Sequence, residues 1–99
     1  METKNSPYTL IEKEVIPQLQ FPQEDVLTDN ESKVRRLHNL ERGSRLGNGY
    51  QGKVEIVFKV ATGDMLRVRT TIWQADKEFV TIKAGVTLPT SAIYSVEFF

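Results

Sequence analysis

Apolar and polar residues alternate from Val54 onward, which is the pattern of strands with one buried face. Val54, Ile56 and Phe58 occupy even positions in the first run. The alternation resumes from Leu66 to Ile72 after the turn signal Thr62-Gly63-Asp64. The pattern predicts a hairpin whose even-numbered side chains, from 54 through 72, are buried.

Three shorter strands are expected after a second turn at Asp76-Lys77. Val80, Ile82 and Ala84 suit the third strand, and Val86-Thr87-Leu88 suit the fourth. A tight turn follows at Pro89-Thr90-Ser91, and Val96 and Phe98 end the fifth strand. Five short, strongly twisted strands cannot fill a flat sheet that is solvated on both faces. We therefore expect them to bend into a small, partly open antiparallel barrel over residues 50–99, because bending buries one face and removes most of the edge.

The spacing of apolar residues changes to a helical period over residues 28–43. Val34, Leu37 and Leu40 form a narrow apolar stripe. Thr28 and Glu31 have the spacing of a capping box, and Gly43 suits a helix C-terminus. The sequence predicts an amphipathic helix at 28–43, a glycine-rich connector at 44–52 and a weakly structured N-terminal arm at 1–27. Residues 28–99 would form a single domain of the mainly β, α+β class.

The predicted order of elements is a helix, a long hairpin, a third strand and a last pair joined by a one-turn corner. This order, and the run from Val86 to Val96, resembles SH3-like and Sm-like small barrels. The chain from Leu40 to Phe98 also resembles a group of short bacterial proteins without an assigned activity. Sm-like RNA binders read bases with polar residues after the second strand and near the corner. This chain has Ala75-Asp76-Lys77 and Thr90-Ser91 there, with no lysine–histidine pair, so the resemblance implies the fold and no RNA-binding residue.

The amino-acid composition excludes several classes of catalytic and metal-binding site. The 99 residues include no cysteine and one histidine, His38, which excludes disulfides, thiolate metal sites, cysteine nucleophiles and sites with two imidazoles. No pattern brings carboxylates together, so we expect no enzyme, no catalytic residue, no metal and no cofactor. The chain shows no signal peptide and no apolar run of about 18 residues, so we expect a cytoplasmic protein without membrane contact.

The segment Gly47-Asn48-Gly49-Tyr50-Gln51-Gly52 matches the phosphate-binding pattern G-x-G-x-x-G. A dinucleotide fold needs a strand before this loop and a helix after it, and the predicted order here is the reverse. A kinase needs strands on both sides and a complete catalytic lobe. We interpret the segment as a helix-to-strand connector whose glycines allow positive φ, with phosphate binding as the alternative.

The neutral total charge, with 13 basic and 13 acidic residues, hides a strong asymmetry. Residues 1–32 hold two basic and seven acidic side chains, a net charge of −5, and residues 33–69 hold nine basic and three acidic, a net charge of +6. The outward side of the first three strands collects basic and aromatic side chains: Lys53, Lys59, Arg67, Arg69, Trp73, Phe79 and Lys83. We call these seven residues the candidate face.

Three interpretations of the candidate face are open. Its aromatic residues, with Val57, could form a second layer covered by the helix or by the N-terminal arm through Tyr8, Leu10 and Phe21. The face could be a groove for a partner protein. It could also bind single-stranded nucleic acid, with phosphates on the cations and bases stacked on Trp73.

These sequence features predict two alternative functions. The first is a non-enzymatic small-barrel binding or assembly module that recognises a protein partner, or another copy of itself, through the final strand ending in Phe98-Phe99. The alternative is a weak RNA- or single-stranded-DNA-binding module that uses the basic 33–69 segment and Trp73, with the acidic 1–32 arm lying over that face.

Overall fold

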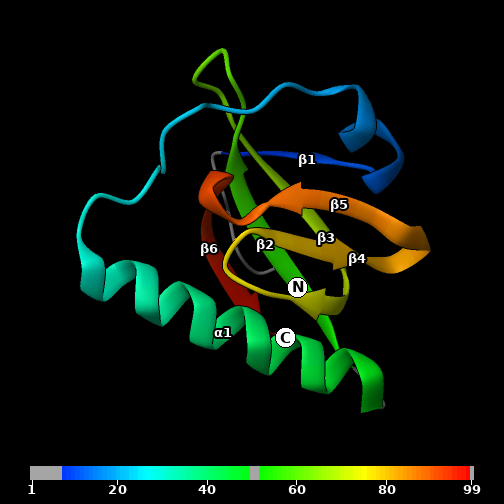
Figure 1. Cartoon of the computed structure of the whole chain (residues 1–99). Helices are drawn as coiled ribbons and strands as arrows, with labels where there is room; N and C mark the ends of the chain where they lie inside the picture. The colour runs from blue at the N-terminus through cyan, green and yellow to red at the C-terminus, as the bar shows by residue number, and fades with distance from the viewer. Residues whose placement is uncertain (1–7, 50–51, 99) are drawn as a thin grey trace.

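A computed structural model describes residues 8–49 and 52–98 of the chain. One long helix, α1 (Asn30–Gly49), lies against a six-stranded sheet (Figure 1). The strands are β1 (Thr9–Ile11), β2 (Lys53–Lys59), β3 (Met65–Ala75), β4 (Phe79–Ile82), β5 (Val86–Pro89) and β6 (Ile93–Phe98). Three short 3₁₀ turns complete the fold: η1 (Lys13–Gln18), η2 (Lys83–Gly85) and η3 (Thr90–Ala92). The expected α+β class is confirmed.

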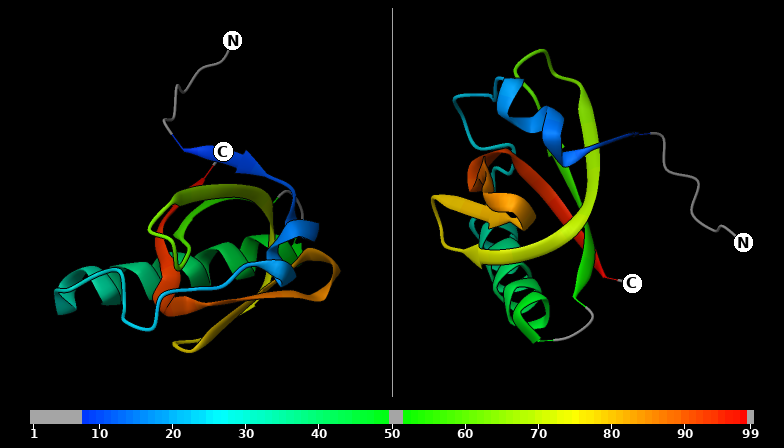
Figure 2. Two further views of the ribbon diagram at one scale, coloured as in Figure 1. Left: turned by 90° about the horizontal axis from the view of Figure 1, so that it is seen from above. Right: turned by 90° about the vertical axis from the view of Figure 1, so that its right-hand side faces the viewer.

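The sheet has the strand order β5-β4-β3-β2-β6, with antiparallel neighbours. β2 pairs with one edge of β3, so the other edge is shared by β4 and by β1, which runs parallel to β3 opposite residues 66–68. β1 is a sixth strand that the sequence pattern did not predict. The long strand β3 is strongly curved (Figure 2). Among the described residues β5 and β6 do not pair with each other, so the sheet stays open where η3 joins them.

The predicted burial of even-numbered side chains is confirmed within the strands. Val54, Ile56, Phe58, Val68 and Ile72 are all buried on the inner face of the sheet. Leu66 is only partly buried, Thr62 and Asp64 in the turn are exposed, and the odd-numbered Glu55 and Val57 of β2 are buried as well. Two-residue periodicity therefore identified the face of the sheet that the core occupies.

The N-terminal segment contributes to the core, which corrects the expectation of a weakly structured arm for its described part, residues 8–27. Ile16 of η1 is 1% exposed and belongs to the central hydrophobic cluster. The Phe21 ring packs against the Phe58 ring, with centroids 6.1 Å apart. In Figure 1 this segment crosses the end of the sheet opposite α1. The core is thus covered at one end by α1, through Leu40, and at the other by residues 16–21.

The helix begins two residues later than predicted, because a different residue caps it. The backbone N–H of Ser32 donates to Asp29 Oδ2 over 2.9 Å, so Asp29 takes the role expected of a box between Thr28 and Glu31. The hydrogen bonds from Ser32 also hold the pKa of Asp29 below its usual value.

The helix also ends later than predicted, at Gly49, so the expected connector 44–52 is mostly helical. Gly43 and Gly47 lie where α1 crosses β3. A Cβ on Gly47 would overlap the carbonyl oxygen of Ile72, and one on Gly43 would lie 2.9 Å from Ile72 Cδ1. A Cβ on Gly52 would overlap the backbone of Gly47. Gly47 and Gly52 permit close packing of backbone on backbone, and Gly43 leaves room for the Ile72 side chain. Gly47 and Gly52 do not adopt the positive φ that we expected. Residues 50 and 51 of the motif lie outside the described residues.

Candidate functional site

Two arginines of the candidate face are joined to a buried carboxylate. Glu55 on β2 is 5% exposed and lies opposite Arg69 in the register of β2 and β3. Its Oε1 accepts hydrogen bonds from Arg69 Nε at 2.9 Å and from Arg67 Nη1 at 3.1 Å. Arg67 Nε also donates to the carbonyl oxygen of Tyr8 at 2.8 Å, which ties the start of β1 to β3. This triad therefore holds three strands together.

The charge of Glu55 is stabilised inside this triad. Burial alone would raise the pKa of Glu55, but the hydrogen bonds from Arg69 and Arg67 outweigh burial and the pKa is lowered. One negative charge thus partly neutralises two positive ones. The middle of the candidate face is an ion-pair cluster rather than a row of cations available to phosphates.

Of the aromatic residues of the candidate face, Trp73 lies at a β-bulge in β3, between Ile72 and Gln74, and Phe79 begins β4. Trp73 is 46% exposed and Phe79 is 55% exposed, so the expected cover over them is wrong. Val57 is buried. α1 does not cover the outward face, because Gly43 packs against Ile72 on the inner one.

The three lysines of the candidate face come from β2 and η2. Lys53 and Lys59 stand at the two ends of β2, and Lys83 is in η2. Lys53 and Lys83 are exposed, and Lys59 is half-buried. Two acidic residues of the 1–32 segment pair with arginines of the basic 33–69 segment, Asp25 with Arg36 and Glu31 with Arg35.

A second buried ion pair joins the N-terminal segment, α1 and β6. The Arg36 side chain is 6% exposed, and its Nη1 and Nη2 donate to the two carboxylate oxygens of Asp25 at 2.8 and 2.7 Å. Arg36 Nη1 also donates to the carbonyl oxygen of Ile93 at 3.0 Å, and the N–H of Leu27 donates to Asp25 Oδ1 at 2.9 Å. In the sequence, Arg36 and Asp25 contribute only to the net charges of their segments, and no pattern indicates that they are in contact.

The hydrogen bonds from Arg36 hold the pKa of Asp25 below its usual value, against the opposing effect of burial. The bidentate geometry is the strong form of an arginine–carboxylate pair. Arg36 Nε is buried and has no acceptor among the described residues. The pair fixes the position of the N-terminal half of α1 relative to β6.

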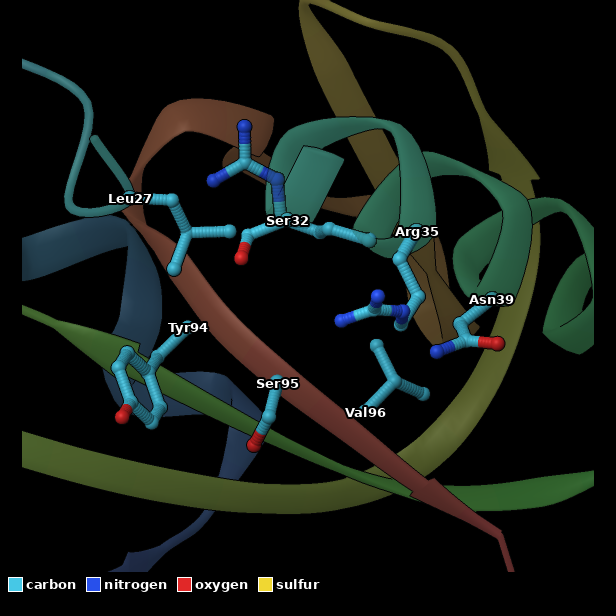
Figure 3. A pocket seen from close by; sticks show the side chains of 8 residues that line it. Leu27, Ser32, Arg35, Asn39, Tyr94, Ser95 and Val96 are labelled. Atoms are coloured by element: carbon cyan, nitrogen blue, oxygen red, sulfur yellow. The ribbon is translucent and has the colours of Figure 1, made fainter. Parts of the chain in front are cut away.

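A groove runs between this half of α1 and β6, and we call it the α1–β6 groove. It holds a cavity of about 270 Å³ lined by Leu27, Ser32, Arg35, Arg36, Asn39, Tyr94, Ser95 and Val96. The Arg35 and Asn39 side chains point from α1 toward β6, and Val96 points back toward α1 (Figure 3). Farther along, the Arg42 guanidinium lies 4.4 Å from the centroid of the Phe98 ring.

The groove follows an edge of the sheet. β6 pairs with β2 on one side, and no strand of the described part of the chain pairs with its other side. Alternate residues of such an edge strand direct their backbone N–H and C=O groups away from the sheet. The groove thus combines backbone hydrogen-bonding groups with polar side chains from a helix.

Comparison of the chain with family models, with curated proteins and with solved structures gives no match. Within residues 8–49 and 52–98, no group of three or more metal-ligating side chains comes together. Neither does any helix in these ranges have the length and apolarity needed to cross a membrane.

Proposed function

We propose that this chain is a non-enzymatic binding module that recognises an extended segment of a protein partner along β6. The observation that carries the proposal is the position of β6 at the end of the strand order, with the α1–β6 groove beside it. A segment that adds to an edge strand gains main-chain hydrogen bonds, and neighbouring side chains then select its sequence.

The proposal includes the SH3-like or Sm-like small barrel as the fold. The strand order β5-β4-β3-β2-β6, the bent sheet and the one-turn corner η3 between β5 and β6 support it. In such a barrel, the seam between the first and last strands of the order is where a partner would pair.

Selection from a library of random nine-residue peptides displayed on phage tests the proposal, followed by NMR titration of the ¹⁵N-labelled protein with a selected peptide. We expect the largest shifts at residues 93–98 and at the facing residues of α1. Shifts that cluster around Trp73 and Phe79, or a library that yields no binder, would contradict it. Sedimentation velocity at tens of micromolar without peptide distinguishes a second copy as the partner, since self-pairing would give dimers or larger species.

The exposure of Trp73 favours a second candidate function, weak binding of single-stranded RNA or DNA. An exposed indole can stack on a base, whereas a buried one cannot. The pairing of Arg67 and Arg69 with Glu55 argues for low affinity, because these cations are already partly neutralised. Titration with an oligothymidylate should quench Trp73 fluorescence, more strongly at low salt, if the face binds nucleic acid. Absence of salt-sensitive quenching would exclude this function.

A further inference from the structure

We propose that the segment bound in the α1–β6 groove is an extended peptide with acidic side chains at alternate positions. This inference rests on the proposed function and specifies the chemistry of the partner. Its first support is charge: α1 carries five lysine and arginine residues against two glutamates. Arg35 and Arg36 both line the groove, and no acidic residue of the described part of the chain lines it.

The two arginines play different parts. Arg36 donates hydrogen bonds to Asp25 and to the carbonyl oxygen of Ile93, so its side chain is held in place between α1 and β6. Arg35 makes only a loose pair with Glu31, at 3.6 Å between Nη2 and Oε2, and both side chains are mostly exposed. Such an exposed ion pair contributes little to stability, because water screens both charges. A carboxylate from a ligand can therefore replace Glu31 at small cost and bind the planar guanidinium through two hydrogen bonds.

The dimensions of the groove suit an extended chain. β6 has six residues and, at roughly 3.3 Å per residue, spans about 17 Å. The part of α1 that lines the groove, from Ser32 to Asn39, spans about 11 Å at roughly 1.5 Å per residue, and beyond it Arg42 packs on the Phe98 ring. The groove therefore faces about three or four residues of an added strand.

The spacing of groups on α1 matches the repeat of that strand. Arg35 and Asn39 are four residues apart, about 6 Å along the helix. Every second side chain of a strand lies on the same face, roughly 6.6 Å from the last. A ligand carboxylate beside Arg35 thus places the next helix-facing side chain beside Asn39, whose amide can donate a hydrogen bond to a second carboxylate.

The same displayed library of random nine-residue peptides tests this inference. We expect the selected peptides to carry Asp or Glu at alternate positions. Arg35→Glu should weaken binding of a selected peptide at least tenfold. Arg45→Glu makes the same charge change at an exposed site on the same helix outside the groove, and should alter binding by less than about threefold. A peptide with Lys in place of its acidic residues should bind Arg35→Glu more tightly than it binds the unmodified protein, which guards against a folding defect.

The outcomes separate this inference from the proposed function. Neutral or basic peptides that shift residues 93–98 in the NMR titration would overturn the acidic specificity and leave strand addition at β6 in place. Equal losses for Arg35→Glu and Arg45→Glu would overturn it too, because binding would then follow the overall charge of α1. Peptides whose shifts map away from β6 would overturn both.

Discussion

Substitution of Asp25 by Asn tests whether the buried pair with Arg36 holds the N-terminal segment, α1 and β6 together. The change leaves the guanidinium buried beside a neutral amide that cannot accept both of its hydrogen bonds. Arg36 also retains the carbonyl oxygen of Ile93, so the charge keeps one acceptor. We expect the variant to fold but with a smaller free energy of unfolding.

The magnitude follows from burial. Removing one partner of a fully buried ion pair costs roughly 3–5 kcal/mol. The Asp25 side chain is 22% exposed, so we expect a lower loss, about 2–4 kcal/mol. A domain of this size has a total stability of roughly 5–10 kcal/mol, so the loss is a large fraction and should lower the Tm by about 15 °C.

Urea denaturation followed by circular dichroism measures the loss. Glu31→Gln is the matched control: it also removes a carboxylate that pairs with an arginine of α1, but at an exposed site, and should change stability by less than about 0.5 kcal/mol. The double variant Asp25→Asn/Arg36→Met should recover part of the loss, because no buried charge remains.

The pH dependence gives an independent check. The pKa of Asp25 is lower in the folded than in the unfolded state, so the stability that the pair supplies is fully present above the unfolded pKa of about 3.9. It is lost as the pH falls through the folded pKa. The difference between the unmodified protein and Asp25→Asn should therefore be constant near pH 7 and shrink in acid. A loss no larger than that of Glu31→Gln, or a difference that grows on acidification, would show that the pair does not stabilise the fold.

Four further substitutions are informative. Gly47→Ala should lower the Tm although alanine favours helix, because its Cβ meets the carbonyl oxygen of Ile72. Gly43→Ala should lower the Tm less, since its Cβ meets a side-chain methyl that can move, and equal decreases in Tm would contradict this explanation. Ile16→Ala should cost about 2–5 kcal/mol in urea denaturation, and a loss below about 1 kcal/mol would mean that the N-terminal segment is not part of the core. Glu55→Gln should cost about 2 kcal/mol at pH 7, and less below about pH 4 because Glu55 has a lowered pKa; an unchanged urea midpoint at pH 7 would contradict a structural role for the triad.

The sheet could be predicted because its signal is local. Each strand of the β2–β3 hairpin shows the alternation in its own residues, and the corner at Thr90 follows from the preceding proline and the break in apolar spacing. The sixth strand β1 has no such signal. Only three residues pair, and they do so in parallel with β3, from which they are separated by more than 50 positions.

The end of the helix could not be predicted from local propensity. The sequence predicts a helix end at Gly43 and a connector that includes Gly47, since glycine weakens an isolated helix. Here tertiary packing favours glycine inside the helix, because only glycine allows α1 to cross β3 so closely at Ile72.

The candidate site also combines features that the sequence predicts with features that it does not predict. Counting charges revealed a basic segment but not which cations are paired, because the partners Glu55 and Asp25 are defined by strand register and by the path of residues 19–27. The α1–β6 groove depends on the angle between a helix and a strand more than 40 residues apart in sequence, and hydrophobic periodicity contains no information on that angle.

Hydrogen exchange of the β6 amides, measured by NMR with and without a selected peptide, distinguishes strand addition from docking of side chains alone. If an extended segment pairs with the outer edge of β6, alternate amides among residues 93–98 should exchange at least tenfold more slowly in the complex, while amides already bonded to β2 change less. If a saturating peptide leaves every β6 amide at its original rate, β6 is not the surface on which this protein binds its partner.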